Sequence, residues 1–219
     1  MTGRLCAACC YMFYLMNKQN LLTGSRILFA LLGFSAVVTE IAVLNERGRF
    51  IPANFFSYFT VESNLFAVII LMLSAIAVSN HRKNDQVALL RGSSTLNMII
   101  VGIIFSLLLA GLDGDLTAVP WDNTVLHYIM PVFIAFDWCI DPPKVHIAFR
   151  RALIWMVLPI AYVMYSLIRG HFISWYPYPF LSPAEHGYFA VAIVCVAVAL
   201  VGIGLIWVLT RFTRQKKLD

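Results

Sequence analysis

The sequence predicts an all-α polytopic membrane protein that crosses the bilayer six times. Hydrophobic residues occupy 61% of the 219 positions and charged residues only 12%, whereas a soluble domain is about half apolar and about a quarter charged. Six apolar stretches approach the roughly 20 residues that a helix needs to cross a bilayer. They predict one six-helix membrane domain over residues 26–212 and a basic tail over residues 213–219.

The first half of the chain is predicted to contain three spans, at residues 26–45, 55–79 and 94–112. The polar joint NERGRFIPAN separates the first span from the second, and the charged joint NHRKND separates the second from the third. The acidic joint DGDLTAVPWDN then ends the third span. Charged side chains are costly in hydrocarbon, so we expect each joint to lie at a membrane surface.

The second half is predicted to contain spans at residues 125–140, 152–168 and 188–209, separated by DPPK and RGHFISWYPYPFLSPAEHG. The fourth and fifth spans contain proline, which membrane helices tolerate where neighbouring groups satisfy the freed carbonyl. Residues 1–25 carry the apolar run LCAACCYMFYLM, which at about a dozen residues is too short to span. We expect an interfacial segment or a leader there.

Basic residues predict the orientation. Of the 16 Lys and Arg residues, 13 fall on the side that holds both termini, and only Arg47, Arg49 and Arg169 fall on the other side. Cytoplasmic loops carry the excess of Lys and Arg, so both termini are predicted to be cytoplasmic. The net charge of +5 then reflects topology and contact with anionic membrane lipids, and it does not indicate nucleic acid binding.

No metal site or cofactor is expected. Cys6 and Cys9 form a single C-x-x-C, and the sequence contains no second such pair that would complete a zinc site. A haem held by two histidines lacks its second ligand, because His127 is the only histidine inside a predicted span.

Three polar residues are predicted to lie at one level near the outer membrane surface. With a rise of about 1.5 Å per residue, Glu40, Thr60 and His127 lie near the outer ends of the first, second and fourth spans. A hydroxyl, an imidazole and a carboxylate are the parts of a nucleophile, a general base and an orienting group. The structural alternative is open, since threonine in a membrane helix often bonds a backbone carbonyl or packs at a helix contact.

Further polar residues are candidates to support that chemistry. Ser57 and Asn64 are spaced to share a helix face with Thr60, and each is a candidate oxyanion donor or a structural polar group. Glu40 is a candidate to orient the imidazole or to bond between helices. Asp137 lies ten residues after the histidine, about 15 Å along a helix, and is expected in a polar network at the cytoplasmic end.

Three segments carry a family resemblance. Residues 58–65 (YFTVESNL) resemble an aromatic-Leu/Phe-Thr motif at the start of a span, and residues 126–137 contain a His, a nearby Pro and an acidic residue ten positions after the His. Residues 175–181 (WYPYPFL) resemble a W-x-YPFL loop. In this order they resemble the androgen-induced membrane proteins, a family of integral membrane threonine hydrolases with six-span bacterial relatives. The VESN segment is similar to the bacterial branch.

The resemblance implies a lipid ester hydrolase in a bacterial inner membrane. It implies that Thr60 is the nucleophile and His127 the essential histidine. The implied substrate is a fatty acid ester of a hydroxy fatty acid, or another lipid ester, and the partners are membrane lipids. A transporter, a channel or a lipid-binding scaffold is the alternative, although no internal repeat favours a transporter.

The loop at residues 175–181 has two interpretations. As a lid, its residues Trp175, Tyr178 and Phe180 would contact the acyl chain of a substrate. As part of an aromatic belt, they would lie at the membrane interface, where Trp and Tyr are enriched. Arg169, just before the loop, is expected to hold a carboxylate product or to contact a lipid phosphate.

Overall fold

A computed structural model of the protein describes residues 2–79, 85–110 and 117–213, with side chains from residue 17 onward. Within these ranges the chain is helical and contains no strand. The predicted all-α fold of six spans is confirmed, because six helices are long and apolar enough to cross a membrane. They are Asn17–Glu46, Phe59–Val78, Asp85–Leu109, Pro120–Ile140, Phe149–Ile173 and Pro183–Arg211.

Several spans combine an α-helix with a short helical segment of another type. Two π-helical turns, η1 and η2, extend the third span and interrupt the fourth, and a 3₁₀ turn, η3, lies within the fifth. The elements are α1 (Thr2–Glu46), α2 (Pro52–Phe55), α3 (Phe59–Ser79), α4 (Asp85–Ile104), η1 (Phe105–Leu109), α5 (Pro120–Thr124), η2 (Val125–Ile129), α6 (Met130–Ile140), α7 (Phe149–Ala152), η3 (Leu153–Met156), α8 (Val157–Ile173), η4 (Pro179–Leu181) and α9 (Pro183–Arg211).

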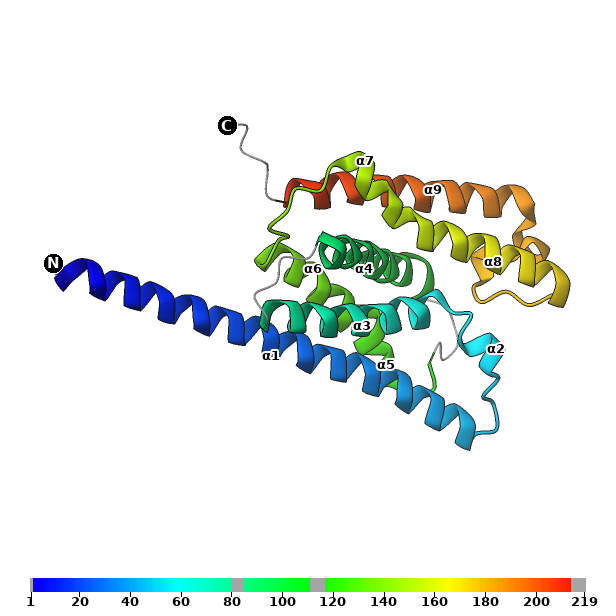
Figure 1. The fold of residues 1–219 in the computed structure, drawn as a ribbon. Helices are drawn as coiled ribbons and strands as arrows, with labels where there is room; N and C mark the ends of the chain where they lie inside the picture. Colours follow the sequence, from blue (N-terminus) through cyan, green and yellow to red (C-terminus); the bar gives the residue numbers. More distant parts are fainter. Residues whose placement is uncertain (1, 80–84, 111–116, 214–219) are drawn as a thin grey trace.

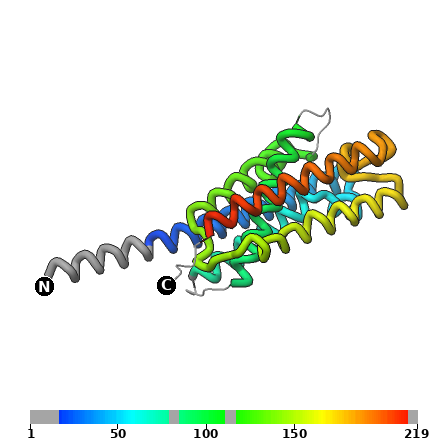
Figure 2. Tube along the Cα trace, turned by 90° about the horizontal axis from the view of Figure 1, so that it is seen from above, coloured from blue at the N-terminus to red at the C-terminus, as the bar shows by residue number. Residues whose placement is uncertain are grey.

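The spans alternate in direction and give the bundle two ends (Figure 1, Figure 2). We call the end that holds Glu46, Phe59, Ile173 and Pro183 the pocket end, and the opposite end the arginine end. Helix α4 is the most buried span and contacts α3, α6 and α9, whereas α9 is the least buried. Large apolar side chains are exposed on the outside of the bundle, as a lipid environment requires.

Some element bounds differ from the prediction. Helix α1 has no break at residue 25, so residues 2–25 are helically continuous with the first span. No proline interrupts residues 2–46, and the hydrogen-bonded ladder therefore continues. The third span begins at Asp85 instead of residue 94, and the fourth begins at Pro120 instead of residue 125. Pro120 lies in the first turn of α5, where its missing N–H costs nothing.

The second span also starts later than expected. Helix α2 ends at Phe55, the chain turns, and α3 begins at Phe59. Ser57 therefore lies in the turn and not on a helix face shared with Thr60. The Ser57 carbonyl accepts a hydrogen bond from the Tyr162 hydroxyl at 3.0 Å, which fixes this turn against the fifth span.

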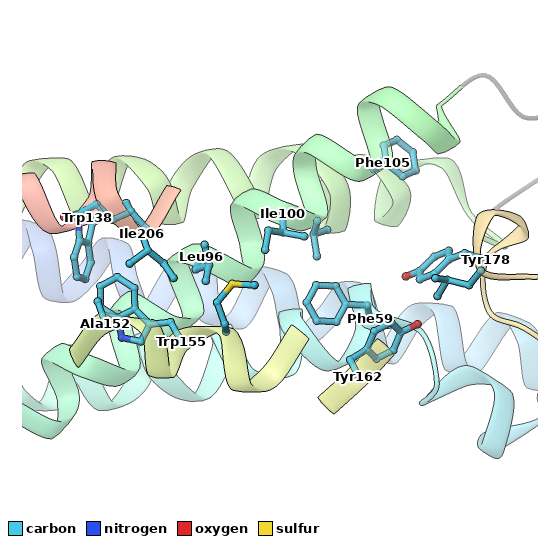
Figure 3. Packing of buried hydrophobic residues seen from close by; sticks show 14 of the residues in the cluster. Phe59, Leu96, Ile100, Phe105, Trp138, Ala152, Trp155, Tyr162, Tyr178 and Ile206 are labelled. Atoms are coloured by element: carbon cyan, nitrogen blue, oxygen red, sulfur yellow. Dashed lines mark hydrogen bonds between the residues drawn. The ribbon is translucent and has the colours of Figure 1, made fainter. Parts of the chain in front are cut away.

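Aromatic residues fill much of the core (Figure 3). Trp138 and Trp155 pack edge to face, with ring centroids 5.8 Å apart. A β-carbon on Gly92 would lie only 2.0 Å from the Trp155 ring, so the absence of a side chain there lets α4 approach the fifth span. The Trp138 indole also donates to the Leu209 carbonyl at 3.2 Å and joins α6 to α9.

A buried charge network joins three spans at the arginine end. Asp137 accepts from Arg26 Nε at 2.7 Å and from Arg91 Nη2 at 2.7 Å. Asp141 accepts a second hydrogen bond from Arg26 at 2.8 Å. The expectation that Asp137 belongs to a polar network is confirmed. Because α1, α4 and α6 each supply a charge, the network sets how these helices are rotated against one another.

The network predicts a large effect of Asp137→Asn on stability. The substitution leaves two buried arginines short of a counter-charge, and breaking such a pair costs about 3–5 kcal/mol. We expect a drop of that size in the free energy of unfolding in mixed micelles. Glu185→Gln, which neutralises an exposed acid on α9, is the control. Equal stability of the two variants would show that the network does not hold the bundle together.

Candidate functional site

The pocket end contains a cavity of about 350 Å³, here called the polar pocket. Thr60 of α3 and His127 of η2 both line it, together with Glu40 of α1 and Trp175 and Tyr178 of the loop before α9. Residues from four separate segments thus meet there. The expectation that Glu40, Thr60 and His127 lie at one level of the bundle agrees with this geometry.

Thr60 lies in the first turn of α3. Its Oγ1 is 3.3 Å from the Tyr178 hydroxyl, and its backbone N–H donates a 3.3 Å hydrogen bond to the same oxygen. The first N–H groups of a helix lack partners within the helix, so Tyr178 satisfies one of them. Figure 3 shows the Tyr178 side chain pointing from its loop into the bundle, towards Phe59. The loop is thereby bonded directly to the candidate nucleophile.

Aromatic neighbours hold the Tyr178 ring. It stacks on Phe180 with centroids 5.2 Å apart and meets Tyr58 edge to face at 5.7 Å. Burial raises the pKa of Tyr178 to about 12, so its hydroxyl keeps its proton at neutral pH. Since this oxygen already accepts from the Thr60 amide, it can donate its own proton to Thr60 Oγ1 or to another oxygen in the polar pocket.

His127 is fixed in one orientation. Its Nδ1 lies 3.0 Å from the Asn123 carbonyl, and a carbonyl can only accept, so Nδ1 carries the proton in this hydrogen bond. In the neutral ring Nε2 is then the basic nitrogen. The imidazole also stacks on Phe105 with centroids 3.9 Å apart.

Both π-helical turns lie at this site, since His127 belongs to η2 and Phe105 to η1. Pro131 explains η2, because it has no N–H to donate to the carbonyl of His127 four residues earlier. Met130 instead donates to the Val125 carbonyl, five residues back. A β-carbon on Gly102 would lie 3.1 Å from Pro131, so α4 passes close to the widened turn. Such turns often occur at functional sites.

No hydrogen bond joins Thr60 to His127 in the described part of the chain. The Thr60 hydroxyl pairs with Tyr178, and the only hydrogen bond found for the His127 ring is that to Asn123. The two side chains face one cavity without touching, as catalytic groups often do before a substrate is bound.

Two candidate oxyanion donors are engaged elsewhere. Asn64 uses its amide N–H groups on the carbonyls of Thr60 at 2.9 Å and Leu126 at 3.2 Å. The Ser57 hydroxyl donates to the Ala53 carbonyl at 2.6 Å and pairs with the Tyr165 hydroxyl. Neither residue lines the polar pocket. These contacts favour the structural interpretation of Ser57 and Asn64 over the oxyanion interpretation.

Glu40 does not orient His127. Its carboxylate accepts the backbone N–H of Ala118 at 2.8 and 2.9 Å, whereas the Asn123 carbonyl holds the imidazole. Glu40 instead closes one wall of the polar pocket by fixing the chain before α5. Beside it lies Asp122, whose side chain is fully buried and interacts with the Glu40 carboxyl group.

The remaining loop candidates separate into two groups. Trp175 lines the polar pocket with Tyr178, whereas Phe180 lies behind it. Arg169 donates to Asn54 Oδ1 at 2.8 Å, and its guanidinium lies 4.9 Å from the centre of the Trp175 ring. Arg169 does not line the pocket, so it holds the loop and is not positioned for a carboxylate product there.

Sequence reasoning missed three features of the site. The hydroxyl of Tyr178 was expected only to contact an acyl chain or lipid, and the stacking of Phe105 on His127 was not anticipated. The second carboxylate, Asp122, was assigned to an acidic joint. The sequence offered one signal of this geometry, Pro131, four residues after His127. A proline there leaves the backbone carbonyl of His127 without its helical donor, but it does not identify the hydrogen-bond partner of the imidazole.

We also searched the described residues for a possible metal site. Within the described ranges no three His, Cys, Asp or Glu side chains are grouped so that they could hold a metal ion.

Comparisons of the chain with models of protein families, with curated proteins and with solved structures found no match. The resemblance to the membrane threonine hydrolases therefore stays a prediction that rests on three short motifs.

The Tyr178 contact predicts a local effect of Tyr178→Phe. Without the hydroxyl, the buried Thr60 N–H has no acceptor, which costs about 1–3 kcal/mol. We expect faster hydrogen exchange at the start of α3, measured by mass spectrometry. Tyr128→Phe removes the hydroxyl of an exposed tyrosine on η2 and should leave that exchange unchanged. Equal exchange in both variants would mean that Tyr178 does not secure Thr60.

Proposed function

We propose that this multi-pass membrane protein is a lipid ester hydrolase in which Thr60 is the nucleophile and His127 the general base. One observation carries the proposal. A threonine hydroxyl, an imidazole with Nε2 as its basic nitrogen and a protonated tyrosine hydroxyl all border one pocket within the bundle. A hydroxyl becomes a useful nucleophile when a base removes its proton during attack, and neutral histidine is the usual base.

Acylation begins when Thr60 Oγ1 attacks the carbonyl carbon of the ester and its proton passes to Nε2 of His127. The tetrahedral intermediate then collapses, the bond between the carbonyl carbon and the alcohol oxygen breaks, and His127 returns the proton to that oxygen. Free alcohol leaves, and the acyl group remains as an ester on Thr60. The bound ester brings the two side chains together, since catalytic hydrogen bonds often tighten only in the substrate complex.

Tyr178 is the proposed donor to the oxyanion of this intermediate. Its hydroxyl lies 3.3 Å from Thr60 Oγ1, so an oxygen on the attacked carbon falls within its reach. Its raised pKa keeps the proton in place at neutral pH. A preorganised donor of this kind is worth roughly 10²–10³ in kcat.

Deacylation returns the enzyme to its starting state. Water attacks the acyl carbonyl while His127 takes one of its protons, and the bond to Thr60 Oγ1 breaks. His127 then gives the proton back to Thr60, and the carboxylic acid leaves. Arg47, Arg49 and Asn54 border the same pocket and give it a polar side through which water can arrive.

We propose that the pocket end faces the outside of a bacterial inner membrane and that the substrate is a membrane lipid ester. The charge bias supports this orientation, because only three of the 16 Lys and Arg residues belong to that end. The lipid-facing apolar surface around the bundle supports a substrate that arrives from the bilayer. The family resemblance adds fatty acid esters of hydroxy fatty acids as the first substrates to test.

A fluorophosphonate probe tests the nucleophile. We expect the native protein in membranes to be labelled, since the probe phosphonylates an activated hydroxyl. Thr60→Ala should abolish labelling, and His127→Ala should slow it strongly. Tyr178→Phe should slow it by roughly 10²-fold, the effect of losing one oxyanion donor. Labelling is followed by in-gel fluorescence over time.

Ser63→Ala is the matched control for this experiment. Ser63 lies in the same helix, is buried and has no hydrogen-bond partner among the described residues, but it does not line the pocket. Its substitution should leave labelling unchanged. Labelling that survives Thr60→Ala, or native protein that is never labelled, would refute the assignment.

A further inference from the structure

A second cavity lies directly behind the candidate nucleophile. Its volume is about 60 Å³, and it is lined almost wholly by apolar side chains, most of them from α4, α8 and α9, among them Ile100, Val101 and Val198. We call it the apolar cavity. Thr60 and Tyr178 line both this cavity and the polar pocket. Thr60 therefore lies on the partition between a polar space and an apolar one.

On its far side the apolar cavity borders a groove on the surface of the bundle. The groove has a volume of about 700 Å³ and runs between α8 and α9; we call it the lipid groove. Val163 of α8 and Cys195 of α9 line both the groove and the apolar cavity. Helices α8 and α9 each pack on α4, and few of their backbone atoms approach each other closely.

The lipid groove lies where hydrocarbon would surround the protein. Phe172 and Tyr188 line it and are largely exposed, and the two helices that form it are membrane-spanning. The three spaces thus follow one another from the polar pocket, past Thr60, through the apolar cavity and past Val163 and Cys195 to the bilayer.

We propose that this sequence of spaces is an acyl-chain channel, in which a linear fatty acyl chain extends from Thr60 between Val163 and Cys195 into the lipid groove. The proposal rests on the proposed function and adds to it the route of the substrate. The ester carbonyl would lie at the partition, the acyl chain on the apolar side, and the alcohol and water on the polar side. An acyl chain fits because it needs no hydrogen-bonding partner along an apolar wall.

Because the apolar cavity is small, the passage between Val163 and Cys195 determines whether a long acyl chain can bind. A cavity of about 60 Å³ is too small for a whole long acyl chain, so it holds only the first carbons of the chain. A long chain must therefore pass Val163 and Cys195. Both side chains are small, and a bulky residue at either position would close the passage. The channel thus favours linear acyl chains over chains branched near the carbonyl.

Photocrosslinking tests the channel without relying on turnover. Thr60→Ala protein in nanodiscs is irradiated with a methyl ester of a long-chain fatty acid that carries a diazirine close to its carboxyl end, and labelled peptides are mapped by mass spectrometry. We expect labels on Ile100 and Val101, which are 3% exposed and closed to bulk lipid. Cys195→Trp or Val163→Trp should lower these labels by roughly tenfold or more.

Leu200→Trp is the matched control, since Leu200 is exposed on α9 and lines none of the three spaces. It should leave the internal labels unchanged, and Cys195→Ala should keep or increase them. The thermal transition of each variant verifies folding. Labels confined to lipid-exposed residues, or internal labels that persist in both Trp variants, would overturn the proposal.

The same variants separate this proposal from the proposed function. If the channel is correct and the protein hydrolyses esters, Cys195→Trp should impair cleavage of a nitrophenyl palmitate but not of a nitrophenyl acetate. Internal crosslinks in a protein that cleaves neither ester would support the channel and refute hydrolysis. Hydrolysis of both esters without internal crosslinks would support hydrolysis and refute the channel.

Discussion

The buried charge network of Arg26, Arg91 and Asp137 is the contact on which the rest of the bundle depends. It joins α1, α4 and α6 at the arginine end through hydrogen bonds of 2.7 Å to one carboxylate. Because a helix is stiff, fixing Asp137 also fixes the rotation and height of the span that carries His127 ten residues earlier. A charge cluster at one end of the bundle thus determines where the imidazole lies at the other.

The structure of the pocket end depends on the hydrogen bonding of backbone groups. In a membrane every backbone polar group needs a partner within the protein, and here the chain departs from regular α-helix several times. The turn before α3, the first turn of α3 and the π-helical turn η2 each leave a backbone group that a side chain of another segment satisfies. Tyr178 and Asn64 carry out part of this task. The same irregularities open the polar pocket, so the features that disturb the helices are those that build the site.

The sequence was sufficient to predict the six spans and to place Thr60 and His127 at the same end of the bundle, because apolar length and chain direction determine both. It was not sufficient for hydrogen-bond partners. Asn64 lies where an oxyanion donor was expected, yet packing against the fourth span commits its amide to the Leu126 carbonyl. Glu40 lies at the right level, but the π-helical turn aims His127 at the Asn123 carbonyl instead. Such choices depend on tertiary geometry that residue spacing does not encode.

If Thr60 is the nucleophile, it carries the acyl group during turnover, and this acyl-threonine can be trapped. Native protein is mixed with a nitrophenyl ester of a long-chain fatty acid, quenched in acid within the first turnover and mapped by mass spectrometry. We expect a burst of nitrophenolate stoichiometric with protein and the added mass of the acyl group on Thr60. Turnover with the acyl group on another residue, or with no covalent intermediate, would contradict it.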